Sequence, residues 1–287
     1  MSITRKQAEN IASVLSEGLP YIQKFKDKII VVKYGGAAMT EELLKESFTR
    51  DIALMQLVGM KPVVVHGGGP QIGKELLKAG VESKFIGGLR VTSRPAMNIV
   101  KKVLGTKINN EIVKLIKQFG GSAISFNHTK YQIIEASKKI NEEGLDLGHV
   151  GQVNKIITGE LKKRIDKGFI PVIAPIGKSK NNDYLNINAD VVAGEVAQSL
   201  KAEKLILLTD VKGIGDSENN LISKISLKNG QKILKEKFIT GGMTPKLTAA
   251  LDAKKRGVKS CHIIDGRVPH AVLLEVLTEE GVGTMIS

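Results

Sequence analysis

Short apolar runs recur along the whole chain, and most are followed by a segment in which apolar residues return at helical spacing. Runs of about four residues rich in Val and Ile predict buried strands, while the longer periodic segments predict amphipathic helices. Thr40, for example, is a suitable N-cap for the helix expected after the first run. This alternation predicts an α/β fold with a mainly parallel central sheet covered by helices on both faces. The runs are 29–32, 62–65, 123–126, 170–173, 205–208 and 261–264.

Two segments in the middle of the chain depart from that alternation. Residues 85–92 and 131–153 contain short alternating runs broken by glycine, which predict hairpins that project from the sheet and are suited to cover a substrate. The cluster of lysine and asparagine at 178–183 is suited to be a hinge between two halves. The expected organisation is an N-terminal helix in 1–25, an N-terminal lobe in 26–178 and a C-terminal lobe in 179–287.

The chain is strongly basic, with a formal net charge of +14 and a pI near 9.6. A basic nucleic-acid-binding protein is therefore one alternative. However, only seven of the 43 basic residues are arginine, aromatic residues make up 4%, and the lysines are spread over most segments. This distribution favours a solvated lysine-rich surface that attracts small anionic ligands, with no nucleic-acid partner.

Localisation can be predicted from the apolar runs and the single cysteine. The runs are far shorter than the roughly 20 residues that cross a bilayer, and the polar start of the chain does not resemble a signal peptide. Cys261 has no partner for an internal disulfide, which is typical of a reducing compartment. We expect a cytoplasmic protein without membrane contact, in which Cys261 is a buried structural thiol.

Glycines follow the first two predicted strands. Gly35 and Gly36 follow the first, and Gly67, Gly68 and Gly69 follow the second. In open α/β sheets such turns lie beyond the carboxyl ends of the strands, where bare backbone amides and helix N-termini converge on anions. The two turns together predict a site that holds phosphate groups.

Neither turn matches a standard nucleotide fingerprint. The pattern GxxxxGK[ST] is absent, and HGGGPQIG lacks the spacing and the downstream acid of a dinucleotide site. His66 has no nearby serine or cysteine to activate, so a structural role is favoured over that of a catalytic base. The five histidines show no HxxxH spacing, and we expect no metal site built by protein side chains alone.

Seven ordered motifs between about residue 29 and the C-terminus resemble those of the N-acetyl-L-glutamate kinases, a family within the amino-acid kinase superfamily. They are VVKYGG, VVVHGGGPQIG, GLRVTS, YLNINADVVAGEVA, LILLTDVKGI, GGMTPKLTAAL and GVGTMI. The resemblance implies a three-layer αβα sandwich in which the N-terminal lobe binds N-acetylglutamate and the C-terminal lobe binds ATP. The product would be an acyl phosphate. Mg²⁺ would be held mainly by the ATP phosphates and water.

The resemblance also implies roles for individual residues. Lys33 and Lys246 match the lysines on either side of the transferred phosphoryl group, and Asp190 matches the aspartate that orients them. Arg90 and Asn186 match residues that bind the substrate. The other matched positions are Gly68 and Gly69 for the substrate, and Gly36, Thr209, Asp210, Gly241, Gly242 and Met243 for the phosphates and ATP.

A regulatory role is implied for the two ends of the chain. The N-terminal helix resembles the extension found in arginine-inhibited members of the family, which are hexamers built as trimers of dimers. L-Arginine would then be a feedback inhibitor, and the PII signalling protein is a further possible partner. The positions matched to the inhibitor site are Tyr21, His270, Glu275, Glu280, Gly281 and Gly283.

Two further alternatives stay open. A kinase for acetylaminoadipate would suit Arg90 and Asn186 equally well, because one methylene is worth only about 1–3 kcal/mol of discrimination. A non-catalytic ATP-binding subunit would be expected to have lost Lys33 or Lys246, and both are present.

Overall fold

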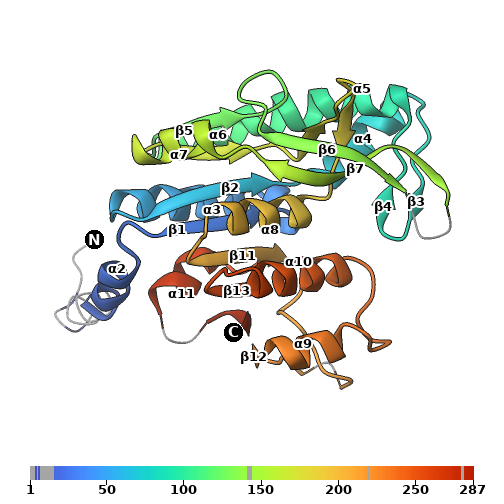
Figure 1. Cartoon of the computed structure of the whole chain (residues 1–287). Coiled ribbons are helices and arrows are strands. Elements are labelled where there is room, and N and C mark those ends of the chain that lie inside the picture. The colour runs from blue at the N-terminus through green and yellow to red at the C-terminus, as the bar shows by residue number, and fades with distance from the viewer. Residues whose placement is uncertain (1–3, 5, 7–15, 141–143, 219, 279–280) are drawn as a thin grey trace.

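An eight-stranded sheet forms the centre of the computed structural model, which describes residues 4, 6, 16–140, 144–218, 220–278 and 281–287. Its strand order is β12-β14-β13-β11-β1-β2-β8-β5, running from the bottom to the top of Figure 1. Only the β13–β14 pair is antiparallel among the described strands of this sheet, so the predicted mainly parallel sheet is confirmed. The strands are β1 (Ile29–Tyr34), β2 (Lys61–His66), β5 (Ala123–Phe126), β8 (Ile170–Ile173), β11 (Lys204–Thr209), β12 (Lys224–Ile225), β13 (Ser260–Asp265) and β14 (Gly283–Ile286).

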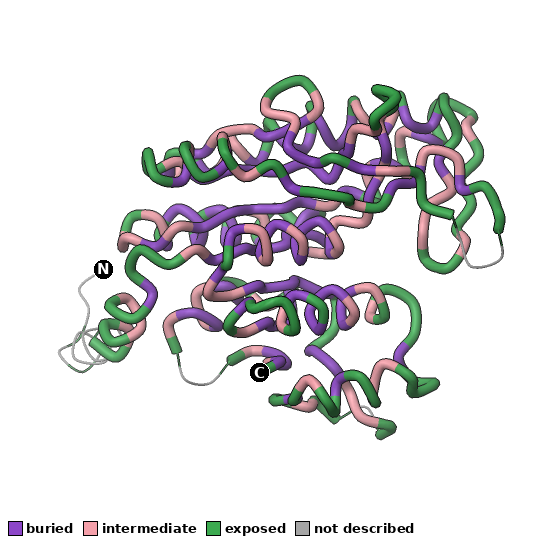
Figure 2. The backbone as a smooth tube through the Cα atoms, viewed as in Figure 1, coloured by how far each residue is buried: buried purple, intermediate pink, exposed green. Residues whose placement is uncertain are grey.

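Helices cover both faces of this sheet, as predicted. Successive side chains of a strand point to opposite faces, so Val32 and Val64 pack in one apolar cluster while Val31 and Val63 pack in the other. The strands are accordingly buried along most of their length (Figure 2). The result is a three-layer αβα sandwich. One layer holds η1 (Gly36–Met39), α3 (Glu42–Leu57), α4 (Gly69–Lys78), α5 (Arg94–Lys102), η2 (Val103–Ile108), α6 (Asn109–Gln118) and α11 (Ala271–Leu277), with α2 (Leu19–Phe25) at its edge; the other holds α7 (Gly159–Asp166), α8 (Ala189–Ser199), α9 (Leu227–Ile233) and α10 (Met243–Lys255).

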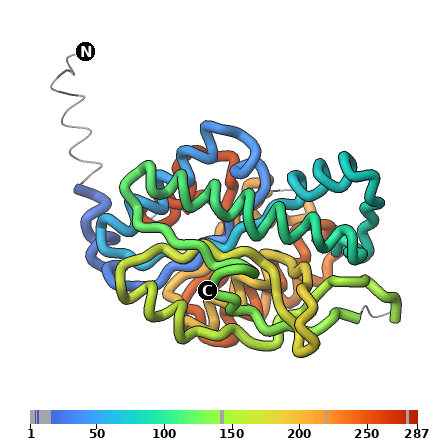
Figure 3. The backbone as a smooth tube through the Cα atoms, turned by 90° about the horizontal axis from the view of Figure 1, so that it is seen from above, coloured from blue at the N-terminus to red at the C-terminus, as the bar shows by residue number. Residues whose placement is uncertain are grey.

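Two helical details bear on the site. The helix after β1 begins one residue later than predicted, because Glu41 is its N-cap while the Thr40 hydroxyl donates to the Ala37 carbonyl. Helices α5 and α6 join through the π-helix η2 into one long run, seen in teal and green in Figure 3. No helix in the described part of the chain is long and apolar enough to cross a membrane.

The two predicted hairpins are present. Strands β3 (Phe85–Ile86) and β4 (Leu89–Arg90) pair antiparallel, as do β6 (Ile134–Ile140) and β7 (Asp146–Ile156). The second hairpin closes into a four-stranded barrel with β9 (Ile176–Lys178) and β10 (Tyr184–Asn186), which the sequence pattern did not indicate. The expected hinge at 178–183 is therefore the short connection between β9 and β10.

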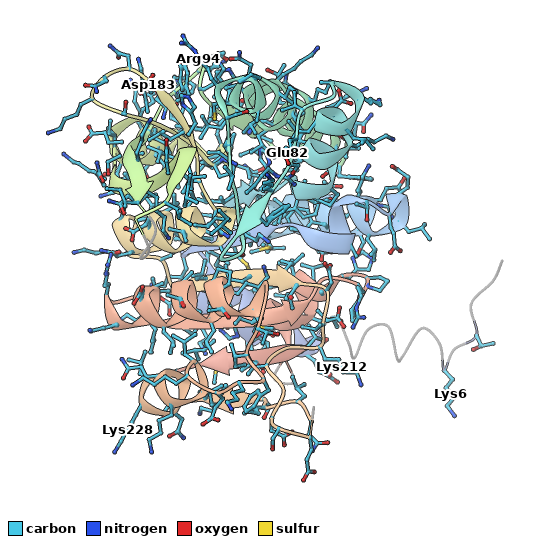
Figure 4. The ribbon with its side chains drawn as sticks, turned by 90° about the vertical axis from the view of Figure 1, so that its right-hand side faces the viewer. Lys6, Glu82, Arg94, Asp183, Lys212 and Lys228 are labelled. Carbon is cyan, nitrogen blue, oxygen red and sulfur yellow. The ribbon has the colours of Figure 1, made fainter. Side chains whose placement is uncertain are left out.

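The strand order identifies where a ligand can bind. The chain passes from β1 to β2 on one side, and β11 pairs with the other side of β1. In open α/β sheets, ligands bind at such a switch point, outside the carboxyl ends of the strands. Figure 4 looks onto this end of the sheet, with Glu82 and Arg94 in its upper half and Lys212 and Lys228 in its lower half.

Replacing a central apolar side chain should destabilise the whole sheet. Leu207 in β11 is fully buried, so Leu207→Ala is expected to lower the free energy of unfolding by about 2–5 kcal/mol, through lost transfer energy and the cavity left behind. Leu77→Ala, at a leucine that is 83% exposed, is the control and should stay within about 0.5 kcal/mol of the parent. Urea unfolding followed by circular dichroism measures both, and equal losses would contradict the assignment of the core.

Candidate active site

The charged side chains of Lys33, Asp190 and Lys246 meet in the interior of the protein. Lys33 Nζ lies 3.3 Å from Asp190 Oδ1, and Lys246 Nζ lies 2.9 Å from Asp190 Oδ2. All three residues are at least 91% buried. They come from β1, the first turn of α8 and the first turns of α10, elements far apart in sequence.

Burial and mutual attraction act in opposite directions on these groups. Burial lowers the pKa of Lys33, since the charged form loses hydration, while the Asp190 carboxylate opposes that shift. Burial acts to raise the pKa of Asp190, but the two ammonium groups outweigh it and the pKa falls below its usual value. The carboxylate therefore stays ionised and holds two like charges close together.

Two clefts meet at this charged cluster. The larger has a volume of about 680 Å³ and the smaller about 330 Å³, and both are lined by Lys33 and Gly36. Asp190 lines only the larger cleft, whereas Lys246 lines only the smaller one. Lys33 therefore stands where a group could pass from a ligand in one cleft to a ligand in the other.

The larger cleft gathers the residues predicted to bind the substrate. Gly68, Gly69, Arg90 and Asn186 all line it. Arg90 donates from Nη2 to the Gly69 carbonyl at 3.0 Å and lies over the Phe85 ring at 4.5 Å. Its Nη1 also bonds to the hydroxyl of Ser83.

Asn186 enters this cleft from β10, which follows the boundary at 178 expected between the lobes. Its amide donates to the Thr92 hydroxyl at 3.2 Å. The Asp190 carboxylate also lines the cleft from beyond that boundary, so the larger cleft takes residues from both sides of 178.

The smaller cleft gathers most of the residues predicted to bind ATP. Thr209, Asp210, Gly242 and Met243 line it, while Gly241 is the residue before Gly242 and does not line it directly. The Asp210 carboxylate accepts a hydrogen bond of 2.5 Å from the Ala37 backbone amide. It lies against Gly36, where an added Cβ would come within 2.2 Å of Asp210 Oδ1.

Helix N-termini converge on the two clefts. Helix α4 begins at Gly69 in the larger cleft, α8 begins at Ala189 beside Asp190, and α10 begins at Met243 in the smaller cleft. The first turn of each helix exposes backbone amides without intrahelical acceptors, and the helix dipole adds a partial positive charge there. Together with the net positive charge of the buried cluster, these ends form an environment suited to phosphate groups.

Side chains suited to hold a metal ion are not gathered here. No group of three or more His, Cys, Asp or Glu residues that could ligate an ion occurs in the described part of the chain. Asp210 is the acid at the mouth of the smaller cleft. The residues present do not form a metal cage of their own.

Residues 28–265 match the profile of the amino acid kinase family. The chain belongs to the amino acid kinase family. Its relatives include the acetylglutamate kinase of Hydrogenovibrio crunogenus, at 53% identity over 100% of this chain and 99% of the relative. The acetylglutamate kinase of Ruthia magnifica is also 53% identical, over 97% and 96% of the two chains. The resemblance drawn from the motifs is therefore confirmed.

Solved structures agree with this family assignment. The amino acid kinase superimposes on the protein smu.665 of Streptococcus mutans with a TM-score of 0.78 at 33% identity, covering 90% of this chain and 98% of the other. N-acetylglutamate synthase of Neisseria gonorrhoeae, complexed with coenzyme A and N-acetyl-glutamate, shares the fold with a TM-score of 0.87 at 24% identity. The chain covers 63% of that synthase, and 96% of this chain is matched.

A second buried polar cluster in this amino acid kinase lies at the other end of the sheet. Glu275 Oε1 in α11 lies 2.6 Å from His262 Nδ1 in β13, and Lys204 Nζ lies 3.3 Å from His262 Nε2. Burial lowers the pKa of both His262 and Lys204. Sequence reasoning missed these two residues, although a histidine and a lysine within otherwise apolar strands are a signal that could have indicated them.

Most residues matched to an inhibitor site lie near the buried cluster of His262, Glu275 and Lys204, whereas His270 lies apart from it. Glu275 is buried, Gly281 lies directly against its carboxylate, and Gly283 begins β14. Tyr21 is in α2, which packs on α11. His270 instead bonds to Asp51 of α3 at 2.6 Å, and Glu280 lies outside the described residues.

Removing the charge of Asp190 should change the titration of Lys33. In Asp190→Asn the attraction that supports the Lys33 ammonium is lost while burial persists, so the pKa of Lys33 should fall further and its proton should leave at lower pH. Titration of ¹³C-labelled lysines by NMR measures this shift. The matched control is Glu195→Gln on the same helix, whose partner Arg256 is about half exposed. An unchanged or raised pKa of Lys33 in Asp190→Asn would contradict the electrostatic account.

Proposed function

We propose that this amino acid kinase transfers the γ-phosphoryl group of ATP to the side-chain carboxylate of N-acetyl-L-glutamate, giving N-acetyl-L-glutamyl 5-phosphate for arginine biosynthesis. The observation that carries the proposal is the pair of lysine ammonium groups held by Asp190 where the two clefts meet. Full-length relatives named acetylglutamate kinase support the choice of substrate.

In this proposal the acyl substrate occupies the larger cleft. Arg90 pairs with a carboxylate of the substrate, because a guanidinium can make two parallel hydrogen bonds to it, and Asn186 supplies a further polar contact. The Gly68 and Gly69 amides at the start of α4 face the phosphoryl oxygens. ATP occupies the smaller cleft beside Gly36, Thr209, Asp210, Gly242 and Met243, with Gly241 shaping the turn before α10.

The transfer itself needs no general base. A carboxylate oxygen of the substrate, already ionised at neutral pH, forms a bond to the γ-phosphorus while the bond to the β,γ-bridging oxygen breaks and ADP leaves with that electron pair. Lys33 and Lys246 stabilise the negative charge on the transferred phosphoryl oxygens and the leaving oxygen. Asp190 fixes both ammonium groups before the reaction, so little reorganisation is required.

In this proposal Mg²⁺ binds together with ATP. Bound to phosphate oxygens and water, it would neutralise phosphate charge, and the chain offers no cluster of carboxylates in its described part to hold it alone.

The single cysteine is buried, and burial raises the pKa of its thiol to about 12. An unreactive, unpaired thiol is consistent with the cytoplasmic location that we propose.

Loss of either lysine should remove most of the phosphoryl transfer. Lys33→Ala and Lys246→Ala are each expected to lower kcat by about 100-fold or more, because a charge that stabilises the transition state is lost. The assay supplies MgATP and N-acetylglutamate and traps the acyl phosphate with hydroxylamine, with acetylaminoadipate and glutamate tested alongside. Lys78→Ala, at a largely exposed lysine on α4, is the control and should retain full activity. Turnover of acetylaminoadipate in preference to N-acetylglutamate would overturn the substrate assignment.

We also propose that L-arginine inhibits the enzyme in a hexamer that forms through the N-terminal segment. Support comes from the contact between α2 and α11, the helix that carries Glu275 at the edge of the buried His262 cluster. A ligand ordered between these elements would couple the N-terminal segment to the sheet through β13.

Deletion of residues 1–25 tests this regulatory proposal. The shortened protein is expected to lose the hexamer in size-exclusion chromatography with light scattering, and to lose inhibition by arginine, while its uninhibited kcat stays within about twofold because Lys33, Asp190 and Lys246 are untouched. An unchanged oligomer with unchanged arginine sensitivity would refute the role of this segment.

A further inference from the structure

His66 is a fully buried histidine that phosphoryl transfer, as proposed above, does not use. It ends β2 and directly precedes the Gly67–Gly69 turn of the larger cleft. Its Nδ1 lies 2.9 Å from the Gly67 carbonyl, and its Nε2 lies 3.1 Å from Nδ2 of Asn109. Both ring nitrogens are therefore engaged, one by the turn and one by a residue 43 positions away.

The partners determine where the protons lie. Asn109 Nδ2 also lies 2.9 Å from the carbonyl oxygen of Val172, which can only accept, so this side of the amide is the NH₂ group. Its second hydrogen then points at His66 Nε2, which must be unprotonated. The Gly67 carbonyl likewise only accepts, so Nδ1 carries the hydrogen. Together the two ends assign the neutral Nδ1–H tautomer to His66.

Asn109 is itself held from the opposite side. It is fully buried at the first position of α6, immediately after the π-helix η2, and its Oδ1 accepts a hydrogen bond from Ser125. The same hydroxyl accepts from Asn127 Nδ2 at 2.8 Å, and Asn127 also donates to the Gly105 carbonyl within η2 at 2.7 Å. A continuous chain of hydrogen bonds, in which Ser125 is only partly buried, thus runs from the π-helix to the glycine turn.

This chain of hydrogen bonds acts on a glycine turn, whose backbone lacks the restraint that side chains would give it. Gly67 N–H donates to the Tyr34 carbonyl at 2.8 Å, so the His66 bond to its carbonyl fixes the second side of the residue. Gly68 has φ = 158°, and an added Cβ would meet Leu104 and Ile108 of η2 at 2.5 Å. The π-helix therefore packs against Gly68 directly and sets the Gly67 carbonyl through Asn109 and His66.

We propose that Asn109 is a positioning residue for catalysis. It fixes the tautomer of His66 and thereby orients the Gly68 and Gly69 amides toward the phosphoryl group that is transferred. The inference rests on the proposed function of the larger cleft. Because Asn109 lines neither cleft, its effect appears in the geometry of the turn, and a misplacement of about 1 Å in such a site can cost roughly 100-fold in rate.

The tautomer can be observed without any assay of activity. In the full-length protein labelled with ¹⁵N-histidine, long-range ¹H–¹⁵N spectra should show one ring with a protonated Nδ1 and an unprotonated Nε2, assigned to His66 by its disappearance in His66→Asn. Asn109→Asp has nearly the same shape but only accepts when it is ionised, so the carboxylate should draw a proton to Nε2 and abolish this pattern. An Nε2–H tautomer in the parent protein would overturn the inference.

Kinetics then test whether the tautomer matters. Asn109→Asp and Asn109→Leu are expected to lower kcat by about 10- to 100-fold with the KM for ATP within twofold, since the smaller cleft is not touched. Thr49→Val is the matched control, because Thr49 is fully buried and bonds only to carbonyls of its own helix in the described contacts. It should retain the parental kcat.

Different outcomes test the positioning role of Asn109 and the proposed phosphoryl transfer. Parent protein that forms no acyl phosphate would refute the proposed function, whereas the NMR result would still decide the tautomer. Active parent protein together with Asn109→Asp that has lost the Nδ1–H pattern but keeps full kcat would refute the positioning role. If Asn109→Leu does not fold, Asn109→Asp decides alone, with the histidine spectra reporting whether its fold is retained.

Discussion

The buried carboxylate of Asp190 allows two lysine ammonium groups to lie close together at the centre of this protein. Two ammonium groups that are each more than 90% buried would repel one another and lose hydration, and Asp190 compensates both at once. Breaking such a buried ion pair by removing one partner typically costs about 3–5 kcal/mol, because a charge is left without compensation. The arrangement also requires β1, α8 and α10 to be packed correctly, so the charged cluster forms only when the sheet and the helical layer that holds α8 and α10 are in place.

The sequence allowed much of this architecture to be predicted, because the relevant signals are local. Strands such as 29–32 and 205–208 are short apolar runs, and the glycines after β1 and β2 mark turns at the carboxyl edge. The motifs around Lys33, Asp190 and Lys246 carried the family resemblance, and the structure brings these three side chains together. Their separate roles stay predictions.

The features that were not predicted depend on contacts between distant segments. The residues near His262 in the sequence do not indicate that Glu275 and Lys204 contact it. The closure of β6 and β7 into a barrel depends on the three-residue strands β9 and β10. The sequence favoured a structural role for His66 but gave no sign of its link to Asn109, which joins β2 to the start of α6 and depends on the π-helix before it. A periodic pattern does not reveal such a link, because it indicates which face of an element a residue lies on and not which distant residue it contacts.

The pairing of β1 has a consequence for how kinases of this kind can diversify. Lys33 stands on a strand that is hydrogen-bonded along its length to β2 on one side and β11 on the other. Any displacement of β1 would break its backbone hydrogen bonds to both neighbouring strands. The position of the Lys33 ammonium group is therefore strongly constrained. New acceptors can then be accommodated by changes around this lysine. The short β3–β4 hairpin that carries Arg90 forms a separate two-stranded sheet, so it can change without breaking either ladder of β1.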